Sequence, residues 1–189
     1  RQSRGLGDVY KRQILDDIKK NKDKALIKLA NKHDNTAYKN ISESKVSESE
    51  IVDAYAHISK QALSNLKKAI INIKRFSKKQ ILKSWSMKVN GSTLGEKVTA
   101  IDRVGIYVPG GKACYPSTVL MNAIPAKTAG VKDITMVCPP IGGKLDPLVL
   151  VAADLCKVDK IYKIGGAHAI GALAYGTETI KQVYKIVGP

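Results

Sequence analysis

The chain has 189 residues, of which 44% are hydrophobic and 25% charged, so it is long enough to bury one sizeable core or two small ones. Its apolar runs are too short to cross a membrane, and the first residues lack the charged-then-apolar pattern of a secretory leader. Three cysteines without CxxC spacing argue against a disulfide scaffold and a zinc knuckle. We therefore expect a reduced, cytoplasmic protein without a membrane partner.

The formal net charge of +16 raises the question of a nucleic-acid partner. Most of the excess lies in residues 1–100, which contain 22 basic and 10 acidic residues. Only five of the 32 basic residues are arginine, and the chain has one Phe and one Trp, so a base-stacking surface is poorly supported. We interpret the lysines as solvated helix faces and predict no nucleic-acid partner. The alternative is a basic module whose affinity for nucleic acid falls steeply with salt.

The first third of the sequence predicts two helices. Residues 1–13 show no apolar periodicity, and we interpret them as a non-native leader, the alternative being a basic arm. From Ile14 to about His33, apolar residues recur on one helical face. Ser47 and Glu50 then form a capping box, and the apolar spacing behind it predicts one helix of about seven turns that ends near Ser77.

The spacing of apolar residues along the sequence changes after these two helices. Alternating segments on both sides of Asn90-Gly91 predict a β-hairpin, because this pair readily takes the two positive φ angles of a type I′ turn. After Arg103, apolar strands and helices alternate, which is typical of βαβ units with a parallel sheet. The strands are expected at 104–108, 134–138, 160–164 and 183–187, and the helices at 117–129, 145–156 and 167–175.

These elements predict an α/β fold in which N-terminal helices and a β-hairpin, residues 14–102, precede an incomplete Rossmann-like parallel sheet, residues 103–189. In the first helix of the sheet region, Ser117 is a candidate N-cap and Gly130 a candidate C-terminal stop. Pro125 must kink or divide that helix. We place Cys138 and Cys156 in the core.

Ligands of an open parallel sheet bind beyond the carboxyl ends of its strands, and two segments of unusual composition are expected there. Residues 107–112, YVPGGK, have paired glycines that allow a close approach to a phosphate, although on physical grounds an ordinary tight strand-to-helix turn is the favoured interpretation. Residues 165–171, GGAHAIG, lack the GxGxxG fingerprint, and their small residues are also explained by close packing. His168 at a helix start is a candidate binding residue. Spacing alone predicts a small-molecule-binding α/β domain and no catalytic constellation.

Three segments together resemble the histidinol dehydrogenase family. They are ILDDIKKNKDKALIKLANKHDN at 14–35, RVGIYVPGGKACYPSTVLMNAIPAKTAGVKDITMVCPP at 103–140, and KIGGAHAIGALAYGTETI at 163–180. The resemblance implies a zinc-dependent, homodimeric enzyme of histidine biosynthesis. Such an enzyme uses NAD twice to oxidise L-histidinol through L-histidinal to L-histidine.

The resemblance also assigns residues. It implies that Tyr107 contacts NAD, that His168 stands where the family has a cofactor-contacting glutamine, and that Ser117 faces the substrate pocket. A histidine offers one hydrogen bond per ring nitrogen but cannot present an amide donor and a carbonyl acceptor together. The family's zinc ligands and acid–base pair have no counterparts in this sequence, so no catalytic or metal residue is assigned. We expect an amino-terminal part that is inactive by itself.

Two alternatives stay open on the sequence. One is a relative of the same fold that oxidises another small polar alcohol, such as a sulfonated diol. The other is a non-catalytic nucleotide-binding module.

Overall fold

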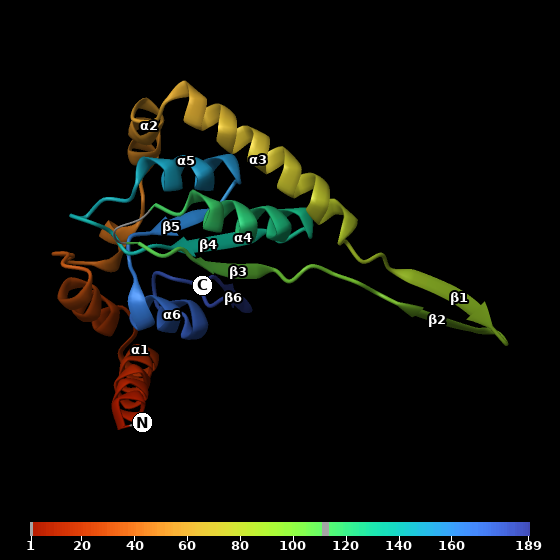
Figure 1. Cartoon of the computed structure of the whole chain (residues 1–189). Helices are drawn as coiled ribbons and strands as arrows, with labels where there is room; N and C mark the ends of the chain where they lie inside the picture. Colours follow the sequence, from red (N-terminus) through yellow and green to blue (C-terminus); the bar gives the residue numbers. More distant parts are fainter. Residues whose placement is uncertain (1, 111–113) are drawn as a thin grey trace.

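A computed structural model of the chain describes residues 2–110 and 114–189, and its centre is a four-stranded parallel sheet (Figure 1). The strand order is β5-β4-β3-β6, so β3, the first strand of this sheet in sequence, lies inside it, as in doubly wound folds. Val104 pairs with Ile134, and Gly105 of the same strand pairs with Ile186. The strands are β3 (Arg103–Tyr107), β4 (Asp133–Val137), β5 (Lys160–Tyr162) and β6 (Lys185–Val187). The predicted fold class is confirmed.

Helices cover both faces of this sheet, and each face has its own core (Figure 1). On one face lie α4 (Pro116–Thr128) and α5 (Pro147–Leu155), with α2 (Glu48–Ala56) and α3 (Lys60–Lys79) packed outside them. On the other face lie α1 (Gln2–His33) and α6 (Gly166–Tyr175), and the short 3₁₀ helix η1 (Ile41–Ser44) lies between α1 and α2 in sequence.

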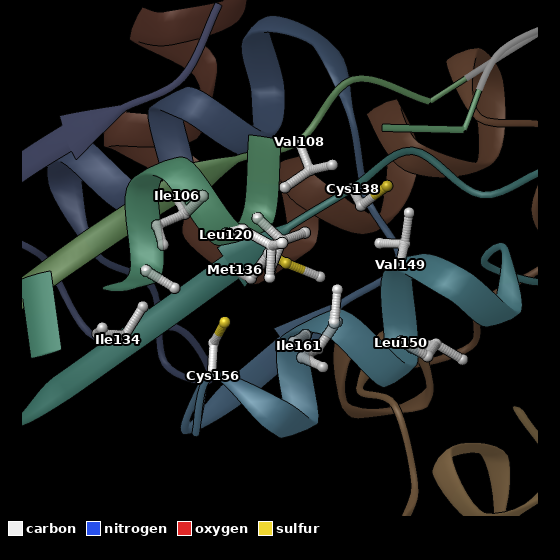
Figure 2. Packing of buried hydrophobic residues seen from close by; sticks show 14 of the residues in the cluster. Ile106, Val108, Leu120, Ile134, Met136, Cys138, Val149, Leu150, Cys156 and Ile161 are labelled. Carbon is white, nitrogen blue, oxygen red and sulfur yellow. The ribbon is translucent and has the colours of Figure 1, made fainter. Parts of the chain in front are cut away.

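The first face buries the larger core, and Figure 2 shows its side chains converging between β4, α4 and α5. Ile134 and Met136 on β4 are fully buried and belong to the same core cluster as Leu120 of α4. Cys138 and Cys156 are buried there as free thiols, which confirms their predicted place.

Helix α1 departs from the predicted helix in two ways. It begins at Gln2 rather than Ile14, so residues 2–13 of the proposed leader are helical and continuous with the helix that follows, and the separate origin of the leader stays a prediction. A break in the helical geometry occurs at Lys22, with φ 48° and ψ −128°. The Lys22 ammonium donates to the carbonyls of Tyr175 and Gly176 at 3.2 and 3.0 Å, where the C-terminus of α6 favours a cation.

The prediction of a single long helix after Ser47 is wrong, because the structure has two helices there. The capping box is confirmed: the Ser47 hydroxyl accepts the Glu50 N–H at 3.2 Å, and the Glu50 carboxylate accepts the Ser47 N–H at 2.9 Å. Helix α2 ends at Ala56, and the Ser59 hydroxyl then caps α3 by accepting the Ala62 N–H at 3.0 Å. Serine competes for backbone donors, which favours a helix start over a helix interior.

Two predictions about α4 are corrected as well. Ser117 does not cap this helix, because the helix already begins at Pro116 and its N-cap, Tyr115, makes no side-chain capping bond. Of the two outcomes predicted for Pro125, division of α4 is wrong, because the helix continues to Thr128, and a kink stays a prediction. The C-terminal stop at Gly130 is confirmed by its φ of +96°.

The predicted hairpin is confirmed, and it projects away from the rest of the chain (Figure 1). Strands β1 (Trp85–Val89) and β2 (Ser92–Glu96) are antiparallel, and Asn90 and Gly91 take φ angles of 48° and 80°. All ten strand residues are exposed.

None of the helices in the described residues has the length and apolar character needed to cross a membrane.

Candidate functional site

The carboxyl ends of β3 and β5 bring together the two residues that the sequence singled out for cofactor binding. Tyr107 is the last residue of β3, and its hydroxyl accepts the N–H of Gly166 at 3.1 Å. Gly166 begins α6, and His168 lies in the first turn of the same helix. Two segments 59 residues apart in sequence therefore meet at one helix start.

The amino end of α6 is partly occupied by these contacts. The first N–H groups of a helix lack intrahelical partners, and Tyr107 satisfies that of Gly166. The backbone N–H groups of Ala167 and His168 follow in the same turn, where the helix dipole favours negative charge. Gly166 itself has φ +57°, a conformation that glycine adopts at low cost.

His168 is buried, with 1% of its surface exposed, and its ring is held by an acidic residue from the other end of the chain. Its Nε2 lies 2.9 Å from Oδ2 of Asp34, the residue that follows α1. The same oxygen accepts the N–H of Gly165 at 3.0 Å. The His33 ring stacks on the His168 ring with centroids 6.0 Å apart.

Asp34 is the site residue that the sequence analysis missed. It is separated from His168 by 134 residues, and the sequence around it indicates only a helix end. Local periodicity carries no signal for a contact of this range, because the contact depends on how α1 packs against α6.

The glycines near this edge serve mainly to pack the strand ends against one another. A Cβ at Gly165 would overlap Pro139, and a Cβ at Gly110 would overlap the Pro139 carbonyl. This favours the tight-turn interpretation of Gly110. Gly111 and Lys112, the rest of the predicted phosphate-approaching loop, lie outside the described residues. In α6, a Cβ at Gly171 would come within 3.2–3.3 Å of Leu15 and Ile18, so small residues there let α6 approach α1.

A cavity of about 420 Å³ opens at the same edge of the sheet, between the loops after β3 and β4. Its wall includes Gly110, Cys114 and Cys138, with Lys144 and Asp146 as the charged groups. Burial raises the pKa of the buried Cys138 thiol to about 12, with the Asp146 carboxylate adding to the effect, so this thiol is not a ready nucleophile near neutral pH. Ser117 is exposed in the first turn of α4 and is not part of this wall.

Within residues 2–110 and 114–189, no three His, Cys, Asp or Glu side chains are close enough to hold a metal ion. These residues therefore do not fit the zinc site that the sequence resemblance implies for the family.

The family model for histidinol dehydrogenase matches residues 8–189. The chain belongs to the histidinol dehydrogenase family. It is 47% identical over 178 residues to a histidinol dehydrogenase of Nitrosomonas europaea, covering 94% of this chain and 41% of the relative. It is 51% identical over 178 residues to a histidinol dehydrogenase of Clostridium acetobutylicum, covering 93% and 41%.

A solved structure agrees with these sequence relatives. The crystal structure of histidinol dehydrogenase from Elizabethkingia anophelis superimposes with a TM-score of 0.89 and 38% sequence identity, over 96% of this chain and 42% of that one. The histidinol dehydrogenase fold is thus shared along nearly the whole chain, which spans about two fifths of the length of its relatives.

Proposed function

We propose that this chain is the amino-terminal part of a zinc-dependent histidinol dehydrogenase and that its carboxyl sheet edge forms one wall of the NAD site. The complete enzyme is a cytoplasmic homodimer that oxidises L-histidinol through L-histidinal to L-histidine. The observation that carries the proposal is the hydrogen bond between the Tyr107 hydroxyl and the Gly166 N–H, because it fixes two cofactor candidates at one helix start.

The residues at this edge suit a dinucleotide. Tyr107 combines an aromatic ring, which packs beside a nucleotide, with a hydroxyl that orients the first turn of α6. The next N–H groups of α6 provide the environment that favours a phosphate, and His168 lies one turn into the helix. When bound, NAD supplies the hydride acceptor, while this wall binds and orients it.

The zinc and acid–base chemistry is assigned to a part of the family enzyme that this chain does not span. No metal-binding cluster occurs in the described ranges, and the resemblance implies that the zinc ligands and the acid–base pair lie in the part of the family that this chain does not span. We propose Ser117 as a residue of the substrate pocket. The isolated chain is expected to bind NAD without turning over histidinol, even with zinc added.

The test is an NAD titration of the purified chain by calorimetry, with variants at Tyr107. Tyr107→Phe removes the hydroxyl and is expected to weaken NAD binding about 2- to 10-fold, the range of one hydrogen bond, and Tyr107→Ala more. Tyr184→Phe is the matched control, because Tyr184 is an exposed tyrosine that packs on Arg103. NAD affinity that is unchanged in Tyr107→Ala contradicts the proposal.

A further inference from the structure

The buried carboxylate of Asp34 holds two separate groups of the proposed cofactor wall. Its side chain is 6% exposed, and its Oδ2 lies 2.9 Å from Nε2 of His168 and 3.0 Å from the backbone nitrogen of Gly165. A buried carboxylate is costly unless it is paired and hydrogen-bonded, and here both partners come from the start of α6. Asp34 therefore joins the end of α1 to the turn that carries Gly166 and His168.

This contact decides what His168 can offer to a ligand. An ionised carboxylate only accepts hydrogen bonds, so the Nε2 atom that faces it carries the proton. In the neutral imidazole, Nδ1 is then an acceptor. The edge of the ring with Nδ1 and Cε1 faces Gly166, since a Cβ on that glycine would lie 3.4 Å from each of these atoms.

The two cofactor candidates thus approach Gly166 with different atoms. The Tyr107 hydroxyl accepts its N–H, while the His168 ring lies beside its α-carbon. The hydrogen bond found between the His168 ring and a described residue is made by Nε2, to Asp34. The His33 ring lies at 28° to the imidazole plane, with the ring centroids 6.0 Å apart.

We infer that Asp34 is a positioning residue of the cofactor site: it fixes the ring and tautomer of His168 so that Nδ1 accepts a hydrogen bond from a hydroxyl or amine of the dinucleotide. This inference rests on the proposed NAD site. It makes the site depend on α1, because without Asp34 the imidazole loses its orienting partner and the N–H of Gly165 loses its acceptor.

A double-mutant cycle on the purified chain tests this role, with NAD affinity measured by calorimetry. Asp34→Ala is expected to weaken NAD binding about 3- to 10-fold when His168 is present, in the range of one hydrogen bond. In the His168→Ala background the same change is expected to weaken binding less, because only the contact of Asp34 with the Gly165 N–H is then left to lose. Asp34→Asn keeps an oxygen acceptor and is expected to recover most of the affinity.

Asp23→Asn is the matched control. Asp23 also lies on α1 and also contacts the chain after α6, where its Oδ2 accepts the Thr179 hydroxyl at 2.6 Å, but it does not touch His168. Its variant should bind NAD within about twofold of the unchanged chain, a difference of about 0.4 kcal/mol.

Proton NMR gives a second readout that does not require NAD. The Nε2 proton of His168 is expected to be protected from exchange in the unchanged chain and in Asp23→Asn, and lost to exchange in Asp34→Ala. A chain that does not bind NAD overturns the proposed site and the role of Asp34 in it. A chain that binds NAD with equal affinity after Asp34→Ala overturns only the inference, as does an equal loss in the His168→Ala background.

Discussion

The strands of the parallel sheet are buried, whereas the strands of the β1–β2 hairpin are exposed. Strands β3 and β4 are covered by helices on both faces, and their central residues are buried. In the hairpin every strand residue is exposed, although Trp85, Met87 and Leu94 lie on one face of it. The sheet is stabilised by packing that the chain itself supplies, whereas the hairpin depends on its turn and on ladder hydrogen bonds.

An isolated two-stranded hairpin is marginally stable in water, so the two regions are expected to open with very different free energies. Short contacts at its base add little: the Ser84 hydroxyl accepts the N–H of Val98 at 2.9 Å at an exposed position. Substitutions in the two regions therefore measure how far the hairpin belongs to the cooperative unit of the sheet.

The largest effect is expected from Ile134→Ala on β4. Ile134 is 0% exposed, so truncation leaves a cavity and should lower the free energy of unfolding by about 2–5 kcal/mol. Urea denaturation followed by circular dichroism measures the change. Met87→Ala, a truncation on the exposed face of β1, should change it by no more than about 0.5 kcal/mol. Equal losses would show that the hairpin is as tightly packed as the sheet.

A second, pH-dependent effect concerns the contact between α2 and the end of β5. Lys163 donates to Glu50 at 2.8 Å. Burial acts to raise the pKa of Glu50, but the hydrogen bonds from Lys163 and Ser47 and the lysine charge outweigh it and hold this pKa below its ordinary value of 4.5. The stabilisation is therefore present above about pH 4.5 and is lost as the pH falls through the folded-state pKa.

Glu50→Gln tests this linkage. The variant should be less stable than the unchanged chain at pH 7, and the difference should shrink as the pH is lowered toward 3, measured by urea denaturation at several pH values. Glu48→Gln, an exposed change in the same first turn of α2, serves as the control. A difference that stays constant with pH would mean that the carboxylate charge does not contribute.

The sequence predicted local structure in both regions wherever one short motif determines the backbone. The capping box at Ser47 and the Asn90-Gly91 turn are confirmed. Wrong predictions arose where two local signals compete: Ser59 starts a second helix inside an apolar pattern that fits one long helix. The family motifs placed Tyr107 and His168, and the structure brings both to Gly166. Asp34 depends on the packing of α1 against α6, which no motif encodes.

The smallest expected effect on global stability comes from the hairpin turn, where Gly91 has φ +80°. Gly91→Val forces a β-branched residue into a conformation that it disfavours, so the hairpin should open more often. Amides of residues 85–96 should exchange faster with deuterium, while the free energy of unfolding of the whole chain changes by less than about 0.5 kcal/mol. Lys88→Thr, which keeps β propensity on the polar face, is the control. A global loss above about 1 kcal/mol would instead place the hairpin inside the cooperative unit of the sheet, because only a coupled element transmits local strain to the whole fold.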